Sequence, residues 1–179
     1  MSIRRYSLNL FPSAVPFQNV QITGSIERSS HIITVSYALL GTLSELVLPA
    51  PAEMPVRRNS LWEETCFELF LGIRNSSRYW EFNISPAGHW NVYRFEAYRQ
   101  GMQEEPAITA LPLSIERKPD SFQLWLKIGL EYIVPADQAL EAAVSVVVKP
   151  VTGPMTYWAL VHPGPKADFH RRDGFIIGL

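Results

Sequence analysis

Apolar residues alternate with other residues in short runs along most of this chain, and the clearest runs lie between Leu61 and Tyr98. A period of two places every second side chain on the same face of a β-strand. Residues 65–71 and 79–85 follow this period, and a third run begins at Trp90. The polar residues 75–77 and the sequence at 86–88 provide turns between the runs. These features predict a three-stranded antiparallel meander.

The turns also predict how these strands pair, since a slip of one residue would move every apolar side chain to the wrong face. We assume a tight turn at Asn75 and a two-residue loop formed by Ala87 and Gly88. The predicted pairs are then Leu69 with Phe82, Glu68 with Asn83, Phe82 with Tyr93, Trp80 with Phe95, and Glu81 with Arg94. One face of the meander becomes aromatic and aliphatic. The opposite face is polar and is the candidate site.

The remainder of the chain shows the same alternation in shorter segments. Further strands are predicted at residues 5–10, 20–26, 31–39, 107–117 with a break at Pro112, 122–128, 143–148 and 155–162. A short segment at 43–48 precedes a proline-bearing loop at 49–59, and residues 135–142 could form one or two helical turns because proline is tolerated in a first turn. About ten short strands separated by turns are typical of a sandwich. We therefore predict an all-β fold, an antiparallel β-sandwich or jelly roll with at most one short helix.

The length and composition limit the other possibilities. A chain of 179 residues fits a single domain spanning 1–179, and roughly 70% of its unfolded surface would be buried on folding. Its one cysteine, Cys66, cannot form an internal disulfide and lies within a predicted strand, which favours a buried apolar role. The net charge of -1 argues against nucleic-acid or acidic-membrane partners. The N-terminal residues 1–17 contain arginines but no continuous apolar stretch, so we expect a soluble, cytoplasmic protein.

Three segments resemble the bacterial DOMON-like proteins, which are related to the type-nine carbohydrate-binding modules. They are Leu61–Leu71 (LWEETCFELFL), Tyr79–Met102 (YWEFNISPAGHWNVYRFEAYRQGM) and the TYWALVHP and KADFH sequences between Thr156 and His170. The resemblance implies a β-sandwich whose sheet face or adjoining cleft binds a ligand, a sugar or haem in the wider superfamily. The tryptophan pair that clamps a sugar in the carbohydrate-binding modules cannot be placed in this sequence.

Glu68 is the first candidate, because a carboxylate in the middle of a strand needs either a partner or water. Asn83 combines a donor and an acceptor suited to hydroxyl groups, although a strand asparagine more often bonds a neighbour. Glu81 and Arg94 could form a structural ion pair, or Arg94 could hold a hydroxyl or carboxylate. Trp62 shares the face of Glu68 by parity and could be a stacking platform, although tryptophan is usually mostly buried.

The C-terminal part of the chain supplies the remaining candidates. Trp158 could belong to either layer of the sandwich. His162 and His170, with Asp168 between them, have ligand chemistry, but their spacing matches no standard zinc pattern, so no metal is predicted. His89 and Met102 are possible haem-ligand types without a pattern that pairs them, and no cofactor is predicted.

These residues favour a non-enzymatic module that binds a carbohydrate or a similar polyhydroxylated small molecule. The predicted ligand-binding residues are Trp62, Glu68, Glu81, Asn83, Arg94, Trp158, His162 and His170. One alternative is a small enzyme acting on a glycoside or cell-wall fragment, with Glu68 and Glu81 as an acid and base pair. Another is a scaffold whose aromatic sheet face meets another protein.

Overall fold

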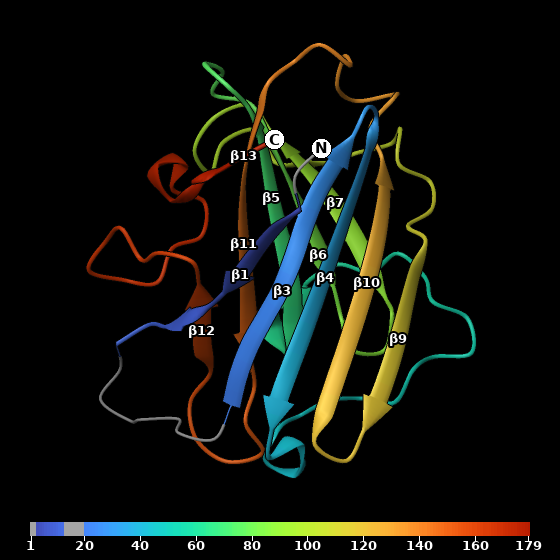
Figure 1. Cartoon of the computed structure of the whole chain (residues 1–179), viewed down its shortest axis with the longest axis vertical. Helices are drawn as coiled ribbons and strands as arrows, with labels where there is room; N and C mark the ends of the chain where they lie inside the picture. The colour runs from blue at the N-terminus through green and yellow to red at the C-terminus, as the bar shows by residue number, and fades with distance from the viewer. Residues whose placement is uncertain (1–2, 13–19) are drawn as a thin grey trace.

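The protein is a β-sandwich in which two sheets of antiparallel strands pack face to face, as shown by a computed structural model that describes residues 3–12 and 20–179 (Figure 1). The five-stranded sheet has the order β1-β3-β4-β10-β9, and it lies in front in Figure 1. The eight-stranded sheet has the order β2-β12-β11-β5-β6-β7-β8, and β13 also pairs with β11. The predicted fold class is therefore confirmed.

The strands and short 3-10 helices (η) have these bounds. The five-stranded sheet contains β1 (Arg4–Ser7), β3 (Val20–Ser29), β4 (Ile32–Gly41), β9 (Leu113–Lys118) and β10 (Ser121–Gly129). The eight-stranded sheet contains β2 (Asn9–Leu10), β5 (Cys66–Ile73), β6 (Tyr79–Ile84), β7 (Trp90–Phe95), β8 (Gln103–Glu104), β11 (Leu140–Val148), β12 (Thr156–Ala159) and β13 (Ile177–Gly178). The 3-10 helices are η1 (Leu43–Glu45), η2 (Leu61–Glu63) and η3 (Arg172–Gly174).

The core lies between the sheets and is built by the alternation seen in the sequence. In β5 the residues Phe67, Leu69 and Leu71 are fully buried and face the other sheet. Phe67 stacks on Phe122 of β10 with ring centroids 5.2 Å apart. The hydroxyl of Tyr37 in β4 donates a hydrogen bond of 2.9 Å to the backbone carbonyl of residue 68, which links the two sheets. These two contacts fix β5 relative to the five-stranded sheet.

The predicted pairing of β5 with β6 is confirmed, because Glu68 lies opposite Asn83 and Leu69 lies opposite Phe82. The predicted pairing of β6 with β7 is wrong by one residue. Trp80 lies opposite Arg94, and Glu81 lies opposite Tyr93. Arg94 therefore shares the face of Trp80, which points toward the core, and is separated from Glu81.

The turn between β6 and β7 explains the error. The N–H of Ser85 donates to the carbonyl of His89, and the N–H of Gly88 donates to the carbonyl of Ser85. This leaves a loop of three residues, 86–88, where two were assumed. Gly88 has a φ of 88°, which glycine adopts at little cost and which three-residue hairpin loops require. One extra residue in the loop reverses the facing of every side chain in the partner strand.

The predicted helical turns at residues 135–142 are also wrong. This segment is a turn that leads directly into β11 at Leu140. The guanidinium of Arg28 donates to the backbone carbonyls of Ala136 and Gln138, and Leu140 exchanges backbone hydrogen bonds with Leu179. These partners replace the intrahelical bonds that a helix would form. The segment predicted at 107–117 forms a strand only after Pro112, as β9.

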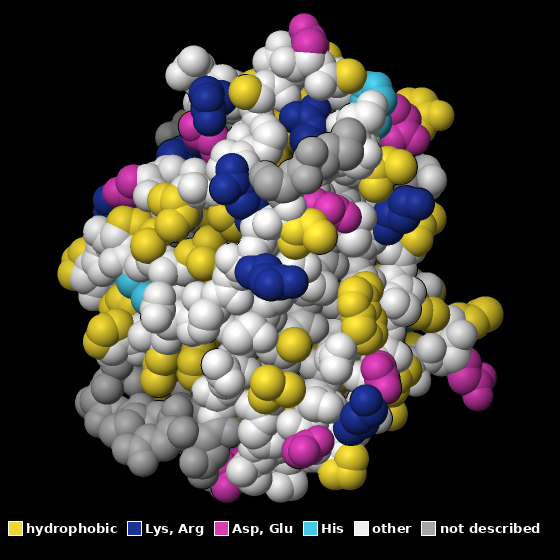
Figure 2. All heavy atoms as spheres, in the orientation of Figure 1, with side chains coloured by type: hydrophobic (Ala, Val, Ile, Leu, Met, Phe, Trp, Pro, Cys, Tyr) yellow, Lys and Arg dark blue, Asp and Glu magenta, His cyan; other side chains and the backbone are white. Residues whose placement is uncertain are grey.

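The outer face of the five-stranded sheet carries apolar side chains dispersed among polar ones (Figure 2). Trp125 of β10 is 36% exposed, and parity with buried Leu124 and Leu126 directs its side chain away from the core. Residues 1–2 and 13–17 of the N-terminal sequence considered above lie outside the described residues. Within the described part of the chain, none of the helices has the length and apolar character needed to span a membrane.

Candidate functional site

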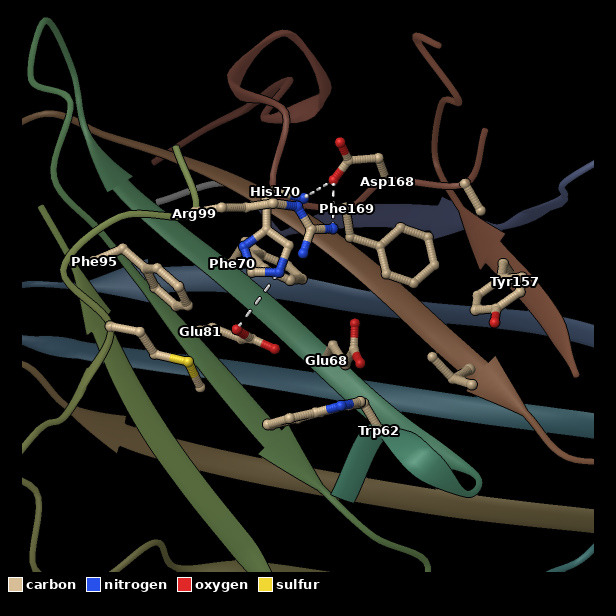
Figure 3. A pocket seen from close by; sticks show the side chains of 13 residues that line it. Trp62, Glu68, Phe70, Glu81, Phe95, Arg99, Tyr157, Asp168, Phe169 and His170 are labelled. Atoms are coloured by element: carbon tan, nitrogen blue, oxygen red, sulfur yellow. Dashed lines mark hydrogen bonds and ion pairs between the residues drawn. The ribbon is translucent and has the colours of Figure 1, made fainter. Parts of the chain in front are cut away.

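A cavity of about 350 Å³ opens on the outer face of the eight-stranded sheet (Figure 3). Its floor comes from β5, β6 and β11, and its walls come from η2, β12, the end of β7 with the turn that follows, and the loop before η3. The residues that line it are Trp62, Glu68, Phe70, Glu81, Phe95, Arg99, Met102, Val147, Tyr157, Ala167, Asp168, Phe169 and His170. The volume is at the lower end of the range for small-molecule sites.

Two carboxyl groups lie at the floor of this cavity. Glu68 is 2% exposed and Glu81 is 4% exposed, yet both line the cavity and both point into it in Figure 3. The hydroxyl of Ser145 donates to Oε2 of Glu68 over 3.1 Å. The amide of Asn83 donates to Oε1 of Glu81 over 2.9 Å. Each carboxyl group therefore has one protein donor and a second oxygen that is available to a ligand.

Burial makes both carboxyl groups difficult to ionise. It raises the pKa of Glu68 well above its usual range, and the neighbouring charge of Glu81 raises it further, while Ser145 and Arg99 act in the opposite direction. Burial also raises the pKa of Glu81 to about 7, against the opposing effects of Asn83 and Arg99. Near neutral pH the pair thus retains protons that exposed glutamates would have lost.

His170 lies above Glu81, with its Nε2 atom 3.9 Å from Oε2 of the carboxyl group. Its Nδ1 atom is 2.9 Å from the hydroxyl of Tyr79, which also accepts a hydrogen bond from the backbone N–H of Arg99. Burial lowers the pKa of His170 to about 4, and the charge of Arg99 contributes to the decrease. His170 is therefore neutral at neutral pH and does not provide a cation for Glu81.

Arg99 and Asp168 connect the turn after β7 to the C-terminal loop. Nη2 of Arg99 lies 2.9 Å from Oδ1 of Asp168, and the hydroxyl of Tyr98 donates to the other carboxylate oxygen. Burial alone would raise the pKa of Asp168, but these donors hold it below its usual range. The same oxygen, Oδ1, accepts a hydrogen bond from the backbone N–H of His170. Asp168 thereby holds the C-terminal loop against the turn after β7, and these two segments form adjacent walls of the cavity.

Aromatic rings surround the carboxyl groups. Trp62 in η2 packs edge to face on Tyr93 with centroids 5.7 Å apart and remains partly exposed. Phe95 stacks on Tyr79 at 4.7 Å and contacts the ring of His170 at 5.1 Å. The other aromatic residues that line the cavity are Phe70, Tyr157 and Phe169. Such rings can stack against the C–H faces of a sugar while the carboxyl groups accept hydrogen bonds from its hydroxyls.

The structure brings together four of the eight predicted ligand-binding residues. Trp62, Glu68, Glu81 and His170 all line the cavity. Asn83 is fully buried on the same face of the sheet and contacts Glu81 instead of lining the cavity. Its Oδ1 atom has no hydrogen-bond partner within the described residues.

The structure places three other candidates elsewhere. Arg94 lies at the edge of the sandwich, where it contacts Glu96 and Gln103. Trp158 is 5% exposed and belongs to the core between the sheets, because parity in β12 turns its neighbour Tyr157 toward the cavity instead. Nε2 of His162 lies 2.9 Å from the backbone carbonyl of Asn9, outside the cavity. The predicted grouping of these three with Glu68 is therefore corrected.

Sequence reasoning did not propose several residues that line the cavity. Parity in β5 could have identified Phe70, since it shares the face of Glu68. Phe95 ends β7 and pairs with Tyr79 on the outer face, whereas the predicted register had placed it opposite Trp80. No local pattern marks Arg99 or Phe169, which are brought in by a turn and by an irregular loop. Among residues 3–12 and 20–179, no three histidine, cysteine, aspartate or glutamate side chains form a group that could hold a metal ion.

Comparisons with known proteins show similarity in structure. No protein-family model matches the sequence. No curated protein matches it either. A candidate carbohydrate-binding protein from Bacteroides uniformis ATCC 8492 is similar with a TM-score of 0.70 at 14% identity, over 97% of this chain and 84% of that one. A family 9 carbohydrate-binding module from Caldicellulosiruptor kristjanssonii, in complex with cellotriose, has a TM-score of 0.50 at 12% identity, over 88% and 74%. At these identities the similarity establishes a shared fold.

Proposed function

We propose that this protein is a non-enzymatic carbohydrate-binding module of the DOMON-like type, and that residues 1–179 form one binding unit. The observation that carries the proposal is the cavity itself, in which aromatic rings flank the two buried carboxyl groups of Glu68 and Glu81. Sugars have apolar C–H faces and hydroxyl edges, so a site for them needs apolar rings beside fixed acceptors and donors.

The polar groups of the cavity suit hydroxyl recognition. A protonated carboxyl group both donates and accepts, so Glu68 and Glu81 can bond hydroxyls of either orientation. The guanidinium of Arg99 lies at the wall and adds donors. Trp62 is partly exposed and its ring is held by Tyr93, so that little conformational entropy is lost when a ligand stacks on it. The fold shared with carbohydrate-binding modules supports this proposal.

A second candidate function is glycoside hydrolysis. Two carboxyl groups in one cavity are the usual catalytic pair, and a pKa near 7 suits a general acid such as Glu81. That chemistry also requires an ionised partner as base or nucleophile. Glu68 does not meet this requirement, because burial raises its pKa well above its usual range and so favours its protonated form. We therefore favour binding over hydrolysis.

A glycan array followed by calorimetry tests the proposal. The purified protein should bind at least one glycan, and calorimetry should give a saturable isotherm with one site per chain. Chromatography of the recovered glycan after prolonged incubation should show it unchanged. Binding to none of the glycans would contradict carbohydrate binding. A shortened glycan, together with loss of its formation in the Glu68→Gln variant, would favour the hydrolase.

A further inference from the structure

Among the described residues, neither buried carboxyl group forms an ion pair with a lysine or arginine, and this feature indicates which class of ligand the cavity would bind. In the described ranges, the hydrogen bonds to the side-chain oxygens of Glu68 and Glu81 come from the neutral groups of Ser145 and Asn83. Nε2 of His170 lies at 3.9 Å from Glu81, but burial lowers its pKa to about 4 and leaves it uncharged. Two acids thus share a buried floor with a neutral base.

The positively charged guanidinium of Arg99, near the floor of the cavity, forms an ion pair with a different carboxylate. Arg99 is paired with Asp168 at 2.9 Å, and its side chain is half exposed at the wall of the cavity. Its charge lowers the pKa of both glutamates, yet burial outweighs this effect for each of them. A buried carboxyl group without a paired cation is harder to ionise, and a ligand that supplies a positive charge favours its ionised form.

The walls also favour a positively charged group. Trp62, Phe70, Phe95, Tyr157 and Phe169 line the cavity. The faces of aromatic rings attract ammonium groups, more strongly where water is excluded. A neutral sugar would use these rings only for stacking. A sugar with a free amino group would use them for stacking and for electrostatic attraction, while its ammonium group would occupy the floor.

We propose that the cavity selects saccharides that carry a free amino group, with the ammonium bound between Glu68 and Glu81. This inference rests on the proposed carbohydrate-binding function and specifies its ligand class. On binding, the protonated carboxyl group of Glu81 releases its proton to the solvent and becomes the carboxylate that pairs with the ligand ammonium. Charge is balanced, since the complex gains the ammonium and loses one proton.

The titratable and charged groups that surround Glu81 come from several elements, and of these Arg99 lowers the pKa of Glu81. They are Cys66 and Glu68 from β5, Tyr79 from β6, Tyr93 from β7, Arg99 from the turn after β7, and Asp168 and His170 from the C-terminal loop. Burial raises the pKa of both tyrosines, so they stay neutral near pH 7. Glu81, whose pKa is about 7, is therefore the group expected to release the proton.

Calorimetry at pH 7 with matched sugars tests the inference. The probes are D-glucosamine, D-glucose and N-acetyl-D-glucosamine, the three corresponding galactose derivatives, and butylamine as an amine without a sugar ring. In at least one series the amino sugar should bind ten-fold or more tightly than both neutral sugars and than butylamine. Repeating the titration in buffers with different ionisation enthalpies should show proton release on binding of the amino sugar and none with the neutral sugars.

The Glu81→Gln variant keeps the shape of the side chain and removes its charge. It should reduce the preference for the amino sugar over the neutral sugar by ten-fold or more. If this variant fails to fold, Glu68→Gln and the proton-release measurement on the unaltered protein serve the same purpose. Neutral sugars that bind as tightly as amino sugars would overturn the amino-sugar inference and leave carbohydrate binding intact. Butylamine binding equally well, or no sugar binding, would overturn both.

Discussion

Nε2 of His170 lies 3.9 Å from Oε2 of Glu81, and burial favours the uncharged form of both groups. The pKa of Glu81 rises to about 7 and that of His170 falls to about 4. In the unfolded chain the same two groups would be oppositely charged between roughly pH 4.5 and 6.5. Folding therefore favours the neutral forms of this pair inside the cavity. Because the two pKa values shift in opposite directions, each residue makes the free energy of unfolding depend on pH in a different way.

The Glu81→Gln substitution should stabilise the protein at high pH. Because the folded pKa is raised, the native state holds the proton more tightly, and the contribution of Glu81 to stability is lost as the pH rises from about 4.5 through 7. Glutamine does not ionise, so the stability difference between variant and unaltered protein should grow by roughly 2 to 3 kcal/mol between pH 5 and pH 8. Denaturant unfolding at both pH values measures it.

The His170→Asn substitution is the matched control for Glu81→Gln and should show the opposite trend. Since the folded pKa of His170 is lowered, its protonation in the unfolded chain destabilises the native state as the pH falls from about 6.5 to 4. Asparagine removes this effect, so the variant should gain stability relative to the unaltered protein toward low pH. If stability relative to the unaltered protein changed in the same direction with pH in both variants, the raised pKa of Glu81 and the lowered pKa of His170 would be contradicted.

The central strands of the site could be predicted because their periodicity is strong. The alternation in β5 and β6 gave the pairing of Glu68 with Asn83. Trp62 reaches the cavity from η2, which lies outside β5, so strand parity with Glu68 does not explain its position. The facing of β7 depended on a single residue in the preceding loop, whose conformation is set by Gly88 with its positive φ. Arg94 was assigned to the wrong face for this reason.

The outer wall of the cavity could not be predicted from periodicity. Asp168, Phe169 and His170 belong to an irregular loop whose position is determined by contacts over long sequence separations. One such contact joins Asp168 to Arg99, which is 69 residues earlier in the chain. Local alternation carries no information about such pairs, so Asp168 and His170 could be recognised as chemically capable but not placed beside Glu81, and Phe169 was not recognised at all.

The Trp62→Ala substitution should weaken ligand binding more than it weakens the fold. The ring of Trp62 is partly exposed and contacts Tyr93, while the adjacent core keeps Phe67 and Leu69. Loss of one aromatic platform should reduce the binding free energy by roughly 1–2 kcal/mol. Trp125→Ala, on the opposite sheet, is the matched control and should leave affinity unchanged. Equal effects of the two substitutions in calorimetry would remove Trp62 from the site.

The Asp168→Asn substitution should impair binding by loosening a wall of the cavity. It removes the charge that pairs with Arg99 and weakens the hydrogen bond from Tyr98. Because the pair is partly exposed, stability should change by no more than about 1 kcal/mol, whereas affinity should fall several-fold. Asp173→Asn is a control in the same region, since Asp173 pairs with the nearby Arg171. A similar loss of affinity in both variants would argue against a specific role for Asp168.

The Glu68→Gln substitution separates a binding site from a catalytic one. In a binding module the change alters one hydrogen bond, so affinity should decrease modestly, by about 1 kcal/mol. In a hydrolase the same change should leave substrate binding nearly intact and reduce turnover by orders of magnitude. Affinity and product formation should be measured on the same glycan. Turnover that depends on Glu68 would replace the binding proposal with the enzymatic one.

The most direct test of carbohydrate binding in this cavity is a titration followed by nuclear magnetic resonance of the tryptophan indole N–H groups. Each of the five tryptophans carries one indole N–H group, and comparison with the Trp62→Phe and Trp125→Phe variants assigns two of the signals. Addition of a glycan selected by the array should shift the Trp62 signal in a saturable manner and leave the Trp125 signal in place. A saturating glycan that leaves Trp62 unchanged, or that shifts Trp125 instead, would contradict the proposed site.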